Sequence, residues 1–282
     1  MAKSSFWRTA LRAQLFNADA RECGNAPAAL AILFLVLSSL MAAFPFMLSR
    51  YSVCVENGQS SHYPGLGSAW LAVAHEGKGV AFQKGELVKS QHTPEKISFN
   101  GWTIAFGKAA SEKLTPPYLA FADQRVLIQS GSYAVNGPAA VLDGIDQKGL
   151  LKLSQNFDAF TNFVKGSLYA LSTVEVPGAF LSIFALMLLQ NLIFVLILGM
   201  FLAMSGLRIG WQTPDEKRRV GYWPSLKTVA CVTAGPGLVA AIFGGVVPQW
   251  GMAVAMVAYS LLLGLRVIMV YMSRFKNKPR KR

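Results

Sequence analysis

The strongest constraint on the fold of this chain is a set of four long apolar runs. The longest carries no charged residue from Val176 through Leu207 and includes the segment LMLLQNLIFVLIL at 186–198. A helix needs roughly 20 apolar residues to cross the hydrocarbon core of a bilayer. A soluble helix would also show a polar stripe with the helical period, which this run lacks. The pattern predicts a transmembrane helix at 178–206.

Three shorter runs have the same character and predict further spans at 28–48, 228–247 and 251–271. The last contains one charge, Arg266, which lies near the end of its helix, so we expect its aliphatic stem to reach the headgroups. A hydrophobic content of 53% agrees with a membrane protein. The predicted fold class is an α-helical integral membrane protein with four transmembrane helices and a small extracytoplasmic α+β domain inserted between helices 1 and 2.

The distribution of charge predicts the orientation. The segments 1–27, 207–227 and 266–282 hold 16 of the 27 Lys and Arg residues and 4 of the 14 Asp and Glu residues, a net charge of +12. The segment 49–177 holds 11 positive and 10 negative residues. Positive residues concentrate on the cytoplasmic side. We therefore expect a bacterial cytoplasmic-membrane protein with both termini, the basic loop 207–227 and the basic tail 272–282 inside, and 49–177 outside.

The N-terminal segment 1–27 is expected to begin with an amphipathic helix at 4–16, SSFWRTALRAQLF. Its aromatic and basic residues fall on opposite arcs, which is typical of a helix in the membrane interface. Packing on the cytoplasmic loops is the alternative. The candidate membrane-interface residues of the chain are Trp7, Arg8, Arg12, Trp223 and Trp250. The basic tail is expected to face anionic lipid rather than nucleic acid.

The segment 49–177 has the pattern of a small α+β domain. Short strands are expected within 68–74, 80–89, 97–106 and 118–129. Asn100 and Gly101 form a strong two-residue hairpin signal between alternating apolar residues, and a second hairpin is expected to turn near Asp123. From Asp146 onward the apolar residues recur at helical spacing, which predicts a helix that breaks near Pro177.

Cysteine and histidine do not suggest a site. The three cysteines, Cys23, Cys54 and Cys231, are assigned to the cytoplasm, the outside and a span, so no intrachain disulfide is expected. The three histidines, His62, His75 and His92, are spaced too widely for a compact metal-ligand pattern. We therefore expect no metal or other cofactor.

Two amides inside the second predicted span call for partners. Gln190 and Asn191 lie in the middle of the apolar run, where an unpartnered amide costs roughly 2–7 kcal/mol. In the third predicted span, Pro236 lacks an N–H and should free a backbone carbonyl. We expect at least one amide to bond to this span or to Thr233, and the other to face the fourth span near Tyr259 and Ser260 or another subunit. The polar residues line either an interhelical contact or a solute path.

Several stretches carry a family resemblance. They are GVAFQKGELVKSQHTPEKISFNGWTIAF at 79–106, YLAFADQRVLIQSGSYAV at 118–135, IDQKGLLKL at 145–153 and YWPSLKTVACVTAGPGLVA at 222–240. Together with the order of segments, they resemble a bacterial family of polytopic membrane proteins catalogued as a domain of unknown function. Some of its members are named maltodextrin-utilisation proteins, and the membrane part looks Yip1-like. The resemblance implies an accessory role linked to carbohydrate utilisation and transfers no catalytic residue.

The sequence lacks the patterns of several enzyme and transporter classes. It contains no phosphate-binding G-x-x-x-x-G-K-[ST], H-E-x-x-H or G-x-S-x-G motif. The predicted spans hold no Asp, Glu or His, the residues that proton relays generally use. We therefore expect a non-enzymatic accessory or assembly protein whose outer domain binds a partner or envelope ligand. The alternative is a subunit of a transport complex. The expected partners are the lipid bilayer and a protein partner or second copy in the membrane.

Overall fold

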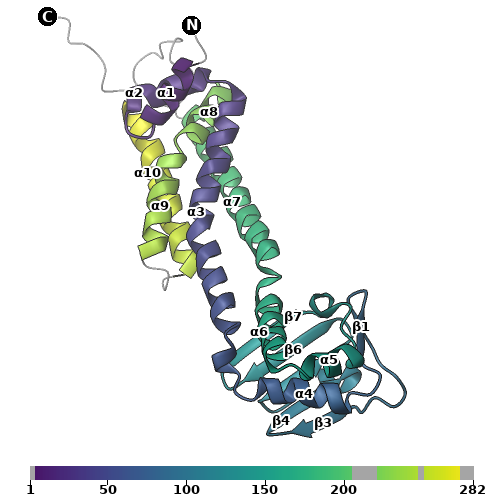
Figure 1. The fold of residues 1–282 in the computed structure, drawn as a ribbon. Coiled ribbons are helices and arrows are strands. Elements are labelled where there is room, and N and C mark those ends of the chain that lie inside the picture. The colour runs from purple at the N-terminus through teal and green to yellow at the C-terminus, as the bar shows by residue number, and fades with distance from the viewer. Residues whose placement is uncertain (1–3, 205–220, 247–250, 274–282) are drawn as a thin grey trace, which may run out of the picture. The chain divides into compact units, whose positions relative to one another are not determined.

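The computed structural model describes residues 4–204, 221–246 and 251–273 and divides the chain into two compact units (Figure 1). The helical unit comprises residues 1–49 and 179–282, and the inserted unit comprises residues 50–178. Within the described residues, four helical segments are long and apolar enough to cross a membrane: Ala28–Asn57, Phe157–Met204, Tyr222–Val246 and Met256–Ser273. The coarse prediction of four such helices, with a sheet-containing unit between the first and the second, is confirmed.

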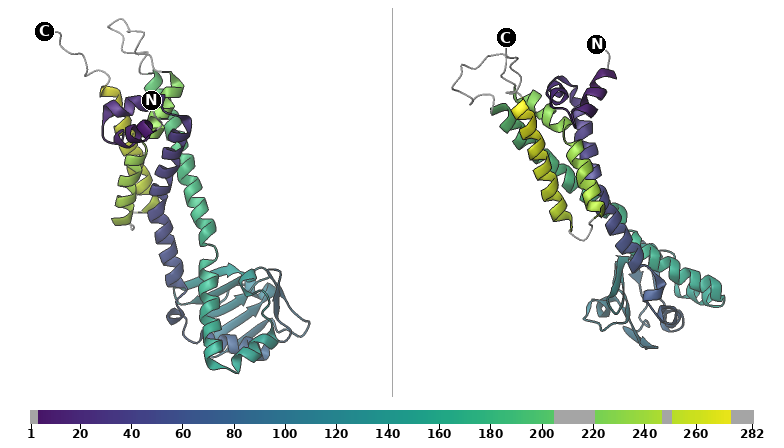
Figure 2. Two further views of the ribbon diagram at one scale, coloured as in Figure 1. Left: turned by 45° about the horizontal axis from the view of Figure 1, so that its top comes forward. Right: turned by 90° about the vertical axis from the view of Figure 1, so that its left-hand side faces the viewer.

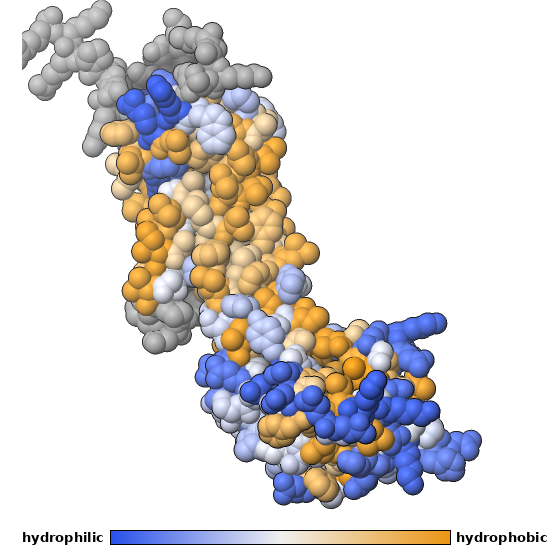
Figure 3. Space-filling model, viewed as in Figure 1, coloured by the Kyte–Doolittle hydropathy of each residue, from blue (hydrophilic) through white to orange (hydrophobic). Residues whose placement is uncertain are grey.

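The helical unit consists of long apolar helices and short helices at one end. Its elements, two of which continue into the inserted unit, are α1 (Ser4–Arg12), α2 (Asn17–Glu22), η1 (Cys23–Asn25), α3 (Ala28–Asn57), α7 (Val176–Met204), α8 (Tyr222–Cys231), α9 (Ala234–Val246) and α10 (Gly251–Ser273). Figure 2 shows α1 and α2 beside the ends of α8 and α10. Hydrophobic residues dominate the visible surface of the long helices (Figure 3). Such a surface is suited to contact with lipid tails.

Small residues let α9 pack closely against α3. A Cβ added at Gly237 would lie 2.6 Å from Ser38 Oγ, and one added at Gly244 would lie 3.2 Å from Pro45 Cβ. Glycine at such positions allows two backbones in a membrane bundle to approach until side-chain hydrogen bonds can form between them. This close approach brings the polar residues of α3 to the third span.

The third predicted span differs from the expectation. Instead of one helix at 228–247, the chain forms α8 and α9 with a break at Val232 and Thr233, and the helical segment begins at Tyr222. Pro236 lies in the first turn of α9 rather than in a helix interior. The first N–H groups of a helix have no intrahelical acceptor, so proline is tolerated there. The sequence suggested that Pro236 frees a carbonyl within a continuous helix, and the structure shows that it does not.

The inserted unit combines a five-stranded sheet with helices. Its strands are β1 (Ala81–Gln83), β2 (Glu86–Val88), β3 (Lys96–Phe99), β4 (Trp102–Phe106), β5 (Tyr118–Phe121), β6 (Arg125–Ser130) and β7 (Tyr133–Pro138). Its helices are η2 (Ser60–His62), α4 (Leu66–Glu76), η3 (Gly107–Ser111), η4 (Ala139–Leu142), α5 (Gln147–Ser154) and α6 (Phe157–Thr173). The sheet order is β3-β4-β5-β6-β7, in which only the β4–β5 pair is parallel. β1 and β2 form a separate hairpin.

The hairpin predictions are confirmed, whereas the first strand prediction is wrong. Asn100 and Gly101 join β3 to β4 with φ of 47° and 81°, the left-handed values that this turn requires. The turn near Asp123 joins β5 to β6. The segment 68–74 instead lies in α4, because its large buried residues Trp70 and Val73 repeat at helical rather than alternating spacing. Strand β7 was not predicted.

One face of the sheet carries the core of the inserted unit. Trp70 of α4 packs edge-on against Phe121 of β5, with ring centroids 5.4 Å apart. The helix predicted from Asp146 divides in two, since Asp146 caps α5 and Asn156 caps α6 through their side-chain oxygens. Figure 2 shows α6 crossing one face of the sheet.

Candidate functional site

The centre of the helical unit contains a buried hydrogen-bond network around Asn191 of α7, which is 1% exposed. Its Nδ2 donates to Ser39 Oγ of α3 at 2.7 Å. Its Oδ1 accepts from the hydroxyl of Tyr259 on α10. Both polar ends of this amide are therefore satisfied inside the bundle, and Asn191 connects α7 to two other helices.

The network continues to the break in the third span. Ser38 Oγ lies 3.1 Å from the Tyr259 hydroxyl and donates to the Thr233 carbonyl at 2.9 Å. Thr233 Oγ1 is 2.8 Å from the Ala230 carbonyl and 3.3 Å from that of Phe34. A carbonyl at a helix break needs such a partner, because lipid supplies none. Ser38 and Thr233 thus hold the break against α3.

Gln190 takes a separate path to α10. Its Nε2 donates to Ser260 Oγ at 3.2 Å and lies 3.5 Å from the Met256 carbonyl. Its Oε1 is buried and has no hydrogen-bond partner within the residues that the structure describes. The expected contact of one amide with Tyr259 or Ser260 is present in the structure for both amides. The expected contact of an amide with the third span or Thr233 is absent among the described residues and was wrong. Ser38, rather than an amide, supplies that bond.

Gln14, between α1 and α2, bridges the break in the third span. Its Nε2 donates to the Cys231 carbonyl at 2.6 Å, and its Oε1 accepts from the Gly235 N–H at 2.7 Å. These backbone groups lie at the end of α8 and the start of α9, where intrahelical partners are missing. This role was not predicted from the sequence. A glutamine in an amphipathic segment gives no signal of it, because its partners lie more than 200 residues away.

The remaining N-terminal contacts also join this segment to the spans. Arg266 of α10 donates to Asn17 Oδ1 and, at 2.6 Å, to the Ala13 carbonyl. The Arg266 side chain therefore contacts the N-terminal segment, and the expectation that it reaches the headgroups stays a prediction. Lys227 of α8 donates to the Ala26 carbonyl at 2.9 Å. These contacts fix the segment to α8 and α10.

Most of the predicted membrane-interface residues are exposed on the surface of the helical unit. Trp7, Arg8 and Trp223 are exposed, although the Trp7 ring lies 5.8 Å from that of Phe34. Arg12 is exposed and pairs with Asp19 at 3.3 Å. Trp250 lies outside the described residues. The exposed aromatic and basic side chains are available to headgroups, while Ala10 and Ala13 form the buried side of the segment.

Cys23 of η1 and Cys231 of α8 lie in thiol contact, although the sequence assigned them to different compartments. The hydrogen bond with Cys231, burial, and the nearby charges of Asp19 and Glu22 raise the pKa of the Cys23 thiol well above its ordinary value. Both thiols are free and buried. A thiol that stays protonated is a poor nucleophile, so Cys23 serves as a packing residue in this state.

The outer face of the sheet in the inserted unit, opposite the core, carries a hollow of about 320 Å³. Its walls come from β5, β6 and the 110–114 region, and its lining residues are Ala110, Ser111, Glu112, Leu114, Tyr118, Ala122, Gln124, Arg125 and Leu127. Apolar and charged side chains thus meet in one concave surface. A volume at the lower end of the range for ligand pockets suits a small ligand or one side chain of a partner.

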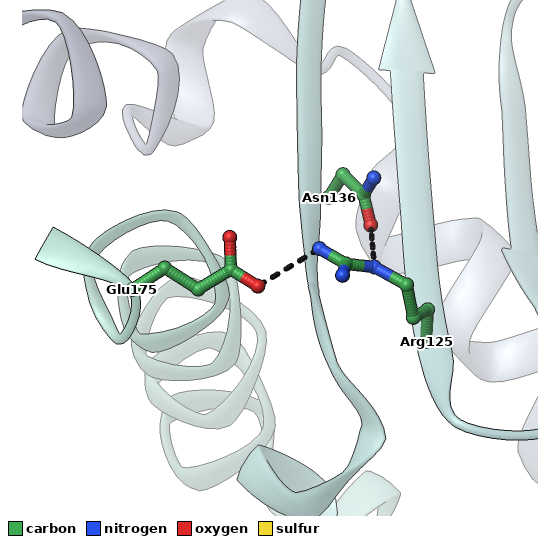
Figure 4. A network of polar contacts seen from close by, with 3 residues as sticks. All are labelled: Arg125, Asn136 and Glu175. Carbon is green, nitrogen blue, oxygen red and sulfur yellow. Dashed lines mark hydrogen bonds and ion pairs between the residues drawn. The ribbon is translucent and has the colours of Figure 1, made fainter. Parts of the chain in front are cut away.

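Arg125, at the rim of this hollow, is held in place by two neighbours (Figure 4). Its Nε donates to Asn136 Oδ1 of β7 at 2.7 Å, and one Nη donates to Glu175 Oε1 at 2.8 Å. Both members of the Arg125–Glu175 pair are substantially exposed, so the ion pair orients Arg125 more than it stabilises the fold.

One histidine packs against an aromatic ring, and the other two are exposed on the surface. His62 stacks on Tyr133 with ring centroids 3.7 Å apart, while His75 and His92 are exposed. Across the described ranges, no group of three or more His, Cys, Asp or Glu side chains is arranged to hold a metal ion. No family model, curated protein or solved structure matches the chain.

Proposed function

We propose that this chain is a non-enzymatic multi-pass accessory or assembly protein of a bacterial cytoplasmic membrane. In this proposal both termini are cytoplasmic, and the inserted unit binds a protein partner or envelope ligand outside. The observation that supports it most is the hollow beside Arg125, which combines apolar walls with charged and polar residues on the outer face of the sheet. The link to carbohydrate utilisation remains a prediction from the family resemblance.

The arrangement of polar groups in the helical unit supports the same proposal. Asn191, Ser38, Ser39 and Tyr259 bond to one another or to backbone carbonyls. Polar side chains satisfied in this way connect helices, with each bond contributing about 0.6 kcal/mol on average. An interhelical staple therefore accounts for this set without a solute path.

A subunit of a transport complex is the second candidate function. The break between α8 and α9 favours it, because interrupted membrane helices form the binding sites of many transporters. Against it, the carbonyls of Cys231 and Thr233 beside the break are already bonded to Gln14 and Ser38. Solute flux into vesicles that contain only the purified protein would support this candidate over the accessory role.

Affinity purification of the full chain tests the proposed function. Leu114→Asp places a charge in the wall of the hollow, while Val88→Asp places one at an exposed apolar residue of β2 outside it. We expect a stoichiometric partner to co-purify with the wild type and with Val88→Asp but not with Leu114→Asp. Equal recovery of that partner with all three proteins would contradict the role of the hollow.

A further inference from the structure

Arg266 carries a charge that no carboxylate in the described part of the chain neutralises. It lies in α10, inside a candidate membrane span, and is 9% exposed. Its two hydrogen bonds go to neutral oxygens, Asn17 Oδ1 and the Ala13 carbonyl. No carboxylate within ion-pair distance of it is found in the described part of the chain. A buried charge is ordinarily paired, since desolvation costs several kcal/mol per ion.

Hydrogen-bonding capacity also remains on this guanidinium. Arginine has five N–H donors, and the two bonds to the N-terminal segment leave three of them. The Nε–H in particular is buried and has no partner among the described residues. An unsatisfied buried donor costs about 1–3 kcal/mol. Charge and unused donors together indicate an acceptor that carries negative charge.

We propose that Arg266 and the adjoining N-terminal segment form a binding site for a phosphate group. The planar guanidinium matches phosphate oxygens in a two-bond geometry, which an ammonium group cannot reproduce. A phosphate would supply both the missing counter-charge and the acceptor for Nε. The inference does not depend on the role proposed for the hollow in the inserted unit.

The same phosphate chemistry can come from a lipid headgroup or from free phosphate. The surroundings favour the lipid, because Leu265 and Met269 next to Arg266 on α10 are exposed and apolar and can contact acyl chains. The acidic residues of this segment are Asp19, which pairs with Arg12, and Glu22, which is exposed. Arg21 and Lys227 lie on the same packed elements, so together with Arg266 they leave an excess of positive charge that attracts an anionic headgroup. Because Asn17 and Ala13 accept from the same guanidinium, a bound headgroup would also strengthen docking of the N-terminal segment.

The test measures thermal unfolding of the full chain purified in a nonionic detergent. Phosphatidylglycerol, phosphatidylcholine or inorganic phosphate is titrated into the wild type, Arg266→Gln and Arg12→Gln. Arg12 provides the matched control, since it is an exposed arginine of the same region. We expect phosphatidylglycerol to raise the melting temperature of the wild type and Arg12→Gln. Its apparent Kd should rise about tenfold or more in Arg266→Gln, the loss expected for a charge-assisted hydrogen bond.

The three titrated compounds distinguish a lipid headgroup from free phosphate as the source of the phosphate group. A response to phosphatidylglycerol alone assigns the site to a lipid headgroup, and a response to inorganic phosphate as well assigns it to the phosphate group itself. Should Arg266→Gln fail to fold, Arg266→Lys retains the charge and should bind more weakly than the wild type. An Arg266 variant that responds to phosphatidylglycerol as strongly as the wild type would overturn the site. A wild type that responds to none of the three phosphate compounds would also overturn it.

Discussion

The bridge formed by Gln14 gives the sharpest prediction for the helical unit. Gln14→Met keeps the length of the side chain and removes both hydrogen-bonding ends. The Cys231 carbonyl and the Gly235 N–H then lose partners at 2.6 and 2.7 Å. Pro236, the next residue, has no N–H to offer, so the chain cannot easily rebuild the first turn of α9 around the loss.

The magnitude follows from the two orphaned groups. Leaving one buried backbone group unsatisfied costs about 1–3 kcal/mol. Gln14 is only partly buried, so water can solvate part of the gap, and we expect Gln14→Met to lower the free energy of unfolding by about 2–4 kcal/mol. Gln190→Met is the control. Its partner Ser260 already donates to the Met256 carbonyl at 2.7 Å, so its loss should cost about 0.6 kcal/mol.

The assay is reversible denaturation of the purified chain in mixed micelles, followed by tryptophan fluorescence. Both variants replace a glutamine by methionine in the helical unit, so a general effect of the substitution would appear in both. Gln14→Glu adds a further comparison, because it keeps the acceptor for Gly235 and loses the donor for Cys231. If Gln14→Met is no less stable than Gln190→Met, the bridge does not stabilise the break and the reasoning is refuted.

Four further predictions concern the polar network, the inserted unit, the thiols and the orientation. Asn191→Leu should cost about 1 kcal/mol, and a double-mutant cycle with Tyr259→Phe should show coupling that a cycle with Ser260→Ala lacks; no coupling to Tyr259 would contradict the network. Burial raises the pKa of Tyr63 to about 12, and its hydroxyl has no partner in the described ranges. The folded state therefore binds more protons than the unfolded state between pH 10 and 12, and stability falls with rising pH in that window. Tyr63→Phe should remove that part of the alkaline loss in denaturant titrations of the two proteins, and identical pH profiles would count against it. Maleimide should modify the partly exposed Cys54 in the folded protein, and the buried Cys23 and Cys231 only after unfolding. Orientation is tested with Ala18→Cys, at an exposed position, in a chain without the native cysteines. Labelling of this cysteine from outside intact cells would contradict the predicted topology.

The sequence by itself determined the features that depend on local periodicity. Apolar runs of bilayer length identified the spans, because a helix in lipid satisfies its own backbone and needs no particular neighbour. The turn at Asn100 and Gly101 was equally local, since two residues with positive φ define it. Where two local readings competed, as at 68–74, short apolar runs were ambiguous, and packing of Trp70 against the sheet decided for a helix.

Only the tertiary structure decided which side chains meet. Gln14 and Cys231, or Arg266 and Asn17, are separated by more than 200 residues, and their contact depends on how each helix is rotated and how closely α9 approaches α3. A rotation of one residue moves a side chain by about 100° around its helix, so depth in the membrane could not predict that Asn191 bonds to Ser39 rather than to the third span. The break before Pro236 was likewise beyond the sequence pattern, because its stability comes from Gln14 and Ser38, which belong to other segments.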